Sequence, residues 1–250
     1  MNPSPPTPPR VVGIDGCRGG WVWIGDVGDG WSGGVVPALE RLRPMLAGSA
    51  LTLIDMPIGL LDAGRAEREC DREARALLGR PRASSVFRVP CRPAMQALDQ
   101  GYTQACEINR RHTGVGLSLQ TFNIMRKIHE VDALLRNHPG MSSIVRESHP
   151  EVCLWGLNRE QSMRFNKRTI GGRRERRELL RRCSSGIEAA VDAVIVQSSR
   201  RDVAVDDAID AAVLALAARR SVEIGRVSAL PKSVPTDSAG LPMAILIPPR

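Results

Sequence analysis

The chain has 250 residues, of which 42% are hydrophobic and 25% charged, so we expect an ordinary globular domain with room for a sizeable core. No apolar run approaches the roughly 18 residues that a membrane span needs, which excludes a membrane protein. The formal net charge of +8 favours polyanionic partners, although an arginine-rich proteome would produce the same excess.

Six cysteines occur without any C-x-x-C spacing, which argues against a zinc ribbon or a thioredoxin motif. Without a signal peptide, reduced thiols in the cytoplasm are the simplest interpretation. The proline-rich stretch 1–10 is expected to be a disordered tail.

The ordered part of the chain is predicted to begin with β-strands. The run VVGID (11–15), the run WVWIGDV (21–27) and a short VV are separated by glycine-rich turns, which predicts a β-hairpin or a three-stranded meander. Apolar spacing predicts a helix over 37–47. LTLID (51–55) is expected to be a fourth strand that stops at Met56, because the following Pro57 disfavours helical geometry there.

The pattern turns helical from about residue 60 to 140, with a loop at RASSVFRVPCRPAM. The longest element, 118–137, has apolar residues at helical spacing. We interpret this region as a mainly helical insertion, about 60–140, that caps the sheet. The segment 143–151 returns to strand character, helices are predicted over 173–183, 187–197 and 205–220, and the tail suggests a final edge strand. The whole of 11–250 then forms one α/β domain.

Acidic residues fall where these elements end. Asp15 and Asp55 end two predicted strands, and Glu147 ends the strand near 145. Asp207 and Asp210 share one face of the last helix. In open α/β sheets, groups at strand ends meet and bind ligands, and clustered carboxylates are suited to Mg²⁺ or Mn²⁺. The pattern therefore predicts a metal site for phosphodiester chemistry.

Each acid also has a structural interpretation. Asp15 could form a turn, Asp55 could cap the segment after its strand, and Glu147 could pair with an arginine. Asp206 is the acid best suited to a purely structural role at the helix start. His149, next to Pro150, could transfer a proton or position water, or it could simply hydrogen-bond the turn.

A strongly basic segment fits a polyanionic partner. Residues 164–182 carry nine lysines and arginines against two glutamates. Lys167 and Arg176 are the preferred phosphate contacts, and Arg18 is a weaker one. A solvated basic face is the alternative for each of them. The tryptophans could stack on bases, although they more often fill cores.

These motifs together resemble a bacterial and archaeal family of unknown function that is described as predicted nucleases of RNase H-like fold. The strings that carry the resemblance are VVGIDGCRGGWV, LIDMPIGL, GLSLQTFNIMRKIHEVD, ESHPEVC, the segment with Lys167, Gly171 and Arg176, and DDAIDAAVLALAA. The last helix is also similar to that of Holliday-junction resolvases of the RuvC type.

The resemblance implies a mixed sheet of three antiparallel strands followed by two parallel ones, flanked by helices. It implies that Asp15, Asp55, Asp207 and Asp210 are metal ligands, while Glu147 and His149 are site residues without a defined role. It also implies a nuclease that acts on DNA or RNA, with a homodimer possible. Two alternatives stay open: a non-catalytic nucleic-acid-binding module, and an actin-like nucleotide phosphotransferase, for which DGCRGGW would be the phosphate loop.

Overall fold

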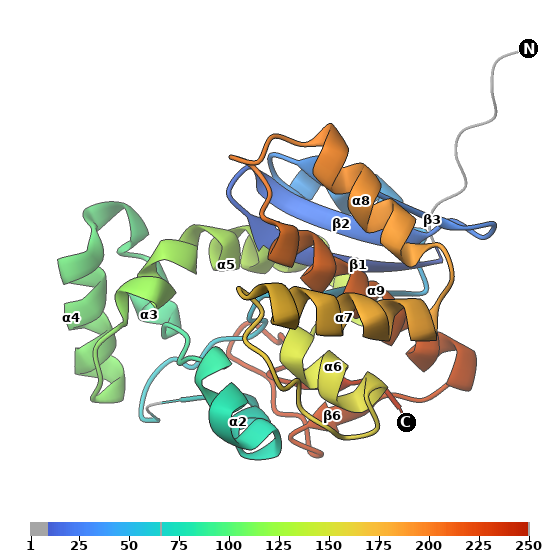
Figure 1. Ribbon diagram of the computed structural model, residues 1–250. Helices are drawn as coiled ribbons and strands as arrows, with labels where there is room; N and C mark the ends of the chain where they lie inside the picture. The colour runs from blue at the N-terminus through green and yellow to red at the C-terminus, as the bar shows by residue number, and fades with distance from the viewer. Residues whose placement is uncertain (1–9, 66, 250) are drawn as a thin grey trace, which may run out of the picture.

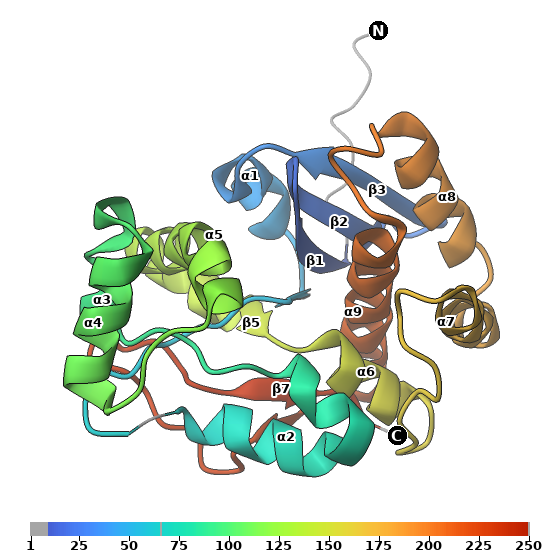
Figure 2. The same cartoon turned by 60° about the vertical axis from the view of Figure 1, so that its left-hand side comes forward.

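A computed structural model describes residues 10–65 and 67–249, so most of the predicted tail lies outside the described residues. A five-stranded sheet in the order β3-β2-β1-β4-β5 forms its centre. The strands are β1 (Val11–Cys17), β2 (Gly20–Asp26), β3 (Trp31–Val36), β4 (Leu51–Ile54) and β5 (Val145–Glu147). The pairs β1–β2 and β2–β3 are antiparallel, whereas β1–β4 and β4–β5 are parallel. This is the RNase H-like arrangement that was expected (Figure 2).

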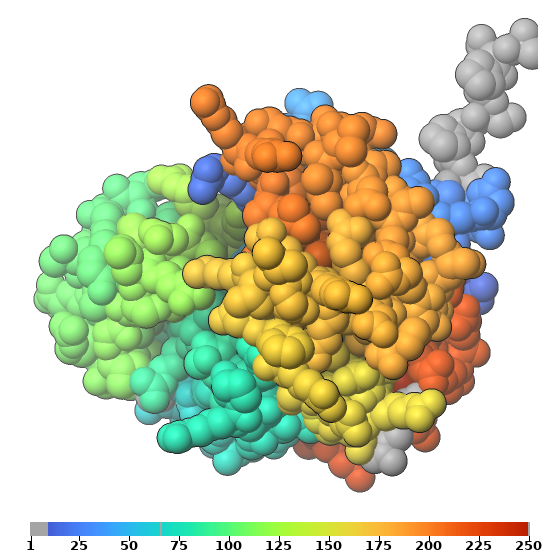
Figure 3. All heavy atoms as spheres, viewed as in Figure 1, coloured from blue at the N-terminus to red at the C-terminus, as the bar shows by residue number. Residues whose placement is uncertain are grey.

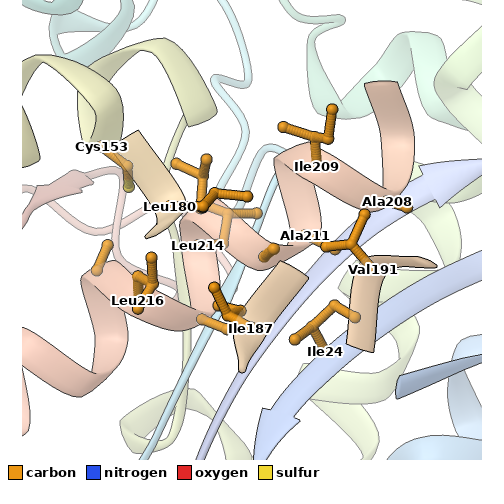
Figure 4. Packing of buried hydrophobic residues seen from close by; sticks show 14 of the residues in the cluster. Ile24, Cys153, Leu180, Ile187, Val191, Ala208, Ile209, Ala211, Leu214 and Leu216 are labelled. Carbon is orange, nitrogen blue, oxygen red and sulfur yellow. The ribbon is translucent and has the colours of Figure 1, made fainter. Parts of the chain in front are cut away.

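One face of the sheet is covered by the last long helix, α9 (Val205–Ile224). Every residue from Ala208 to Ala218 in α9 is buried, because the helix lies between the sheet and a second layer. That layer consists of α6 (Pro150–Leu157) and α7 (Ile170–Cys183), whereas α8 (Ile187–Gln197) lies beside α9 and packs directly against β3. The shared core is aliphatic, and Figure 4 shows side chains of α7, α8 and α9 meeting over β2.

The opposite face packs against α5 (Leu119–Asn137), the predicted long amphipathic helix. Its buried residues Ile128, Val131 and Leu135 join Ile14 and Ile54 in one core cluster. The rest of the region between β4 and β5 is also mainly helical (Figure 1). It contains α2 (Glu69–Arg82), α3 (Arg92–Met95) and α4 (Tyr102–Thr113).

Two elements differ from the sequence predictions. Over 37–47 there is a 3-10 turn, Leu39–Leu42, followed by the short α1 (Arg43–Leu46). The strand predicted over 143–151 ends at Glu147, because Pro150 starts α6 at a position where the missing N–H costs nothing. The edge strand predicted for the tail is present as β7 (Ile245–Ile247), which pairs with β6 (Ser228–Leu230) in a separate small sheet.

A single bridge between Ser148 and Leu246 joins the small sheet to the end of β5. Within the described residues, no helix is both long and apolar enough to cross a membrane.

Candidate functional site

Three predicted site acids converge at the carboxyl ends of β1 and β4. Asp15 lies near the end of β1, Asp55 directly follows β4, and Asp210 lies in the second turn of α9. All three line one cleft of about 940 Å³. Because β1 and β4 are parallel neighbours, their ends open at the same edge of the sheet, where ligands of α/β proteins bind.

Asp15 and Asp210 are buried, Asp55 is half-buried, and the three carboxylates are close enough for their charges to interact. Asp15 is 8% and Asp210 1% exposed. Burial raises the pKa of Asp15 well above its usual value, and the charges of Asp55 and Asp210 raise it further. Burial also raises the pKa of Asp55, and it raises the pKa of Asp210 to about 6. Three carboxylates that share a poorly solvated site are stabilised by a cation placed between them.

Lys167 provides one positive charge within this cluster. Its Nζ atom lies 2.6 Å from Oδ2 of Asp210. Burial alone would lower the pKa of Lys167, but the carboxylates of Asp210 and Asp15 outweigh it and raise that pKa. Lys127 of α5 also lines the cleft, and its ammonium donates a hydrogen bond to the backbone carbonyl of Gly20. Burial lowers the pKa of Lys127.

Asp207 also lines the cleft, but it has a structural partner as well. Its Oδ2 atom accepts a hydrogen bond from the backbone N–H of Ala204 at 3.0 Å, so Asp207 caps the start of α9. Sequence reasoning favoured Asp206 for this role. Burial raises the pKa of Asp207.

Glu147 lines the same cleft as the three aspartates, but Arg68 engages both of its oxygens. Arg68 donates from Nη1 and Nη2 to the two carboxylate oxygens at 2.8 and 2.6 Å, and the Ile58 N–H adds a bond of 2.6 Å. Arg68 also binds both oxygens of Asp71. Burial raises the pKa of Glu147 to about 7, even though Arg68 lowers it. The pairing joins the end of β5 to the start of α2.

Glu151 is a site residue that sequence reasoning missed. It lies in the first turn of α6 and lines the cleft. Its Oε1 atom accepts from Nη2 of Arg176, while its buried Oε2 atom has no hydrogen-bond partner among the described residues. Its charge raises the pKa values of Asp55 and Asp210. Pro150 could have indicated this position, because proline is common at the first residue of a helix. An acid directly after such a proline lies at the helix N-terminus.

Arg176 does not lie where a phosphate contact was expected. Its side chain is 1% exposed and does not line the cleft. Besides Glu151, it binds the carbonyls of Phe165 and Gly172 at 3.1 and 3.2 Å. Arg18, in contrast, is exposed and lines the cleft.

His149 lines the cleft as the N-cap residue of α6. Its Nδ1 atom accepts from the Glu151 N–H at 3.2 Å, and its Nε2 atom lies 3.3 Å from the carbonyl oxygen of Ser85. Both ring nitrogens of His149 are therefore engaged by backbone groups.

The oxygen atoms that line the cleft are of the kind that binds a divalent cation. However, they do not lie close enough together to form a complete metal site. Several carboxylates and the unpartnered oxygen of Glu151 are the hard oxygen donors that Mg²⁺ and Mn²⁺ prefer. However, nowhere in 10–65 and 67–249 do three Asp, Glu, His or Cys side chains lie together closely enough to hold an ion. Lys167 and Arg176 instead pair with Asp210 and Glu151.

Fold and site together define an RNase H-like α/β protein with a carboxylate-lined cleft at its strand ends. The chain belongs to the family described as protein of unknown function (DUF429), whose model matches residues 13–236 and so includes every acid of the cleft. Neither a curated protein nor a solved structure shows significant similarity to the chain.

Proposed function

We propose that the protein hydrolyses phosphodiester bonds of nucleic acid with the help of Mg²⁺ or Mn²⁺. One observation carries this proposal: Asp15, Asp55 and Asp210 line one cleft, where burial and then the charges of Asp55 and Asp210 raise the pKa of Asp15. Buried like charges of this kind are costly unless a cation shares them. Perturbed carboxylates in a cleft are also typical of functional sites.

Asp15, Asp55 and Asp210 would hold the metal after a rearrangement of their side chains, because no three such groups among the described residues already lie close enough together. Asp207 and Glu151, with its unpartnered oxygen, line the same cleft. Because Lys167 binds Asp210, its ammonium has to swing away when the cation enters. Its side chain is 38% exposed, which leaves it room to do so. A metal bound in this cleft supplies Lewis-acid catalysis and an acidified water.

The remaining residues have roles that follow from their contacts. Lys167 and Arg18 bind the phosphate oxygens of the substrate, because both line the cleft and neither is fully buried. Arg176 orients Glu151 through their buried ion pair. His149 caps α6 and fixes the backbone of Glu151, and since both of its ring nitrogens are engaged, we assign it a positioning role.

The test is manganese-dependent hydrolysis of bis(p-nitrophenyl) phosphate and of a panel of oligonucleotides. We expect the wild type to cleave, and Asp210→Asn to lose about 100-fold or more of the rate, as expected for the loss of a metal ligand. Asp99→Asn is the matched control, because Asp99 is 84% exposed and does not line the cleft. Equal activity of wild type and Asp210→Asn, or no hydrolysis of any panel member by the folded wild type, would contradict the proposal.

A further inference from the structure

A second pocket lies at the opposite end of α7 from the acid cleft. It has a volume of about 420 Å³ and forms where the C-terminal ends of α6 and α7 meet the C-terminal half of α9. In Figure 3 the yellow surface of the segment after α6, the gold surface of α7 and the red surface of α9 meet at the right-hand side of the molecule. The 14 residues of α7 span about 20 Å, and the pocket shares no lining residue with the acid cleft.

Arginines supply most of the charge around this pocket. Four arginines and two glutamates line it, namely Arg159, Arg182, Arg219, Arg220, Glu160 and Glu223. Arg219 is paired with Glu223 at 3.5 Å and with Asp26 at 3.9 Å. Within the described residues, the other three arginines form no ion pair. Arg182 contacts only the amide oxygen of Asn158, at 3.4 Å, and Arg220 only the backbone carbonyl of Pro249, at 3.1 Å.

Arg159 occupies a backbone position that favours glycine. Its φ angle is 56°, and that of the following Glu160 is 63°, so both residues are in the left-handed region after the end of α6. Glycine is the usual residue where a helix ends in this way, because a Cβ atom is strained there. Among the described residues, no ion-pair or hydrogen-bond partner holds the Arg159 side chain. The arginine is therefore retained at a conformational cost without a contact inside the protein that offsets it, and it lines the pocket.

The size and lining of the pocket suit a small anionic molecule. A volume of about 420 Å³ lies within the range of about 300–1,000 Å³ that is typical of pockets for small ligands. The guanidinium groups of arginine bind phosphate oxygens through pairs of charge-assisted hydrogen bonds. Leu157 and Leu216 add an apolar surface for the rest of such a molecule. Arginines at helix C-termini also offset the helix dipole, but that role does not require them to converge on one cavity.

We propose that this pocket binds a small phosphorylated molecule, whose phosphate groups are held by Arg159, Arg182 and Arg220 and whose less polar part lies against Leu157 and Leu216. The site is separate from the acid cleft, so its occupancy depends neither on the metal nor on phosphodiester hydrolysis.

The thiol of Cys183 reports binding at this pocket, because it is half-buried and lines it. The test measures alkylation of the folded protein by iodoacetamide in EDTA, followed residue by residue with mass spectrometry. Burial raises the pKa of Cys183, so the reaction is run at pH 8.5. The probes are inorganic pyrophosphate and ADP, compared with sodium chloride at equal ionic strength.

We expect at least one of the two probes to slow the alkylation of Cys183 about fivefold or more near saturation. Cys106 is the internal control, since it is also half-buried but lies in α4, outside the pocket, and its alkylation should not change. A labelled 12-nucleotide strand is tested in the same way, because the backbone of a nucleic acid carries phosphates as well.

Two variants test the assigned arginines through the probe concentration that protects Cys183. Arg182→Gln should raise this concentration about fivefold or more, as expected for the loss of a charge-assisted contact. Arg200→Gln is the matched control, because Arg200 is exposed and lies outside the pocket. Arg159→Gly should weaken protection without lowering the melting temperature, since glycine adopts a φ of 56° without strain.

Unchanged alkylation of Cys183 with both probes, or equal slowing of Cys183 and Cys106, would overturn the inference. Protection that persists unchanged in Arg182→Gln and Arg159→Gly would do the same. Protection of Cys183 by the oligonucleotide at lower phosphate concentration than by either small probe would replace the small molecule with a nucleic-acid backbone.

Discussion

Gly13 of β1 lies directly against the backbone of Ala211 in α9. A Cβ atom on Gly13 would stand 2.1 Å from the carbonyl oxygen of Ala211 and 2.2 Å from the backbone nitrogen of Ala215. Only a glycine permits this approach. Asp15 is two residues beyond Gly13, and Asp210 directly precedes Ala211, so the same contact brings the two carboxylates to one cleft.

Gly13→Ala should therefore destabilise the protein and move Asp210 away from Asp15. The obstructing atoms belong to the backbone of a buried helix, which cannot yield as a side chain would, so we expect a loss of at least about 1–3 kcal/mol of unfolding free energy. Chemical denaturation measures it. Gly30→Ala is the control, because nothing lies within 4 Å of a Cβ there. Two variants of equal stability would show that the close contact is not required.

The acid cluster should cost stability at neutral pH. The pKa of Asp15 is higher in the folded state than in the unfolded chain, so the folded state binds more protons between the two values. Stability then falls as the pH rises above the unfolded value of about 4. In EDTA at pH 7.5, Asp15→Asn should melt at a higher temperature, by about 2–4 °C for each kcal/mol recovered.

That difference should shrink as the pH falls below about 4, where Asp15 becomes protonated in the unfolded as well as the folded state. Asp99→Asn, which changes an exposed carboxylate, should show neither effect. A lower melting temperature of Asp15→Asn at pH 7.5 would count against repulsion within the cluster.

Much of the fold was predictable from the sequence, because its signals are local. Alternating and glycine-punctuated runs predicted the first three strands, and apolar spacing predicted α5, whose residues Ile128, Val131 and Leu135 are buried. Asp15, Asp55 and Asp210 were predictable as cleft residues, since acids at the ends of parallel strands meet at one edge.

The partners of charged residues were not predictable. Glu147 and Glu151 are four residues apart, yet one pairs with Arg68, 79 positions earlier, and the other with Arg176, 25 positions later. Such pairings depend on how distant elements pack. For the same reason, nothing local showed that Arg176 would be buried and Arg18 exposed.

Glu147 should prove structural. Glu147→Gln weakens a buried, charge-assisted contact with Arg68, so we expect a loss of about 1.5–3 kcal/mol of unfolding free energy. The Mn²⁺ affinity of the folded variant should equal that of the wild type, because the carboxylate is already committed to Arg68. Calorimetry of Mn²⁺ binding measures the affinity, and denaturation of the same sample measures the stability. Unchanged stability with a much weaker Mn²⁺ affinity would make Glu147 a ligand instead.

Lys167 should oppose the metal and favour the substrate. Its ammonium competes for Asp210 at 2.6 Å, so Lys167→Met is expected to tighten Mn²⁺ binding severalfold, which corresponds to about 1 kcal/mol. The same change removes a phosphate contact and should weaken binding of a single-stranded oligonucleotide. The exposed Lys232→Met serves as the control for lost charge. Weaker binding of both Mn²⁺ and oligonucleotide would contradict the assigned competition.

The acids of the cleft should bind a divalent cation, and a Mn²⁺ titration of the folded protein is the measurement that decides whether they do. Wild type and Asp99→Asn should bind Mn²⁺ with the same affinity, and Asp210→Asn should bind at least about tenfold more weakly, a change of about 1.4 kcal/mol. Absence of saturable binding by the wild type, or equal affinities for all three proteins, would contradict the claim.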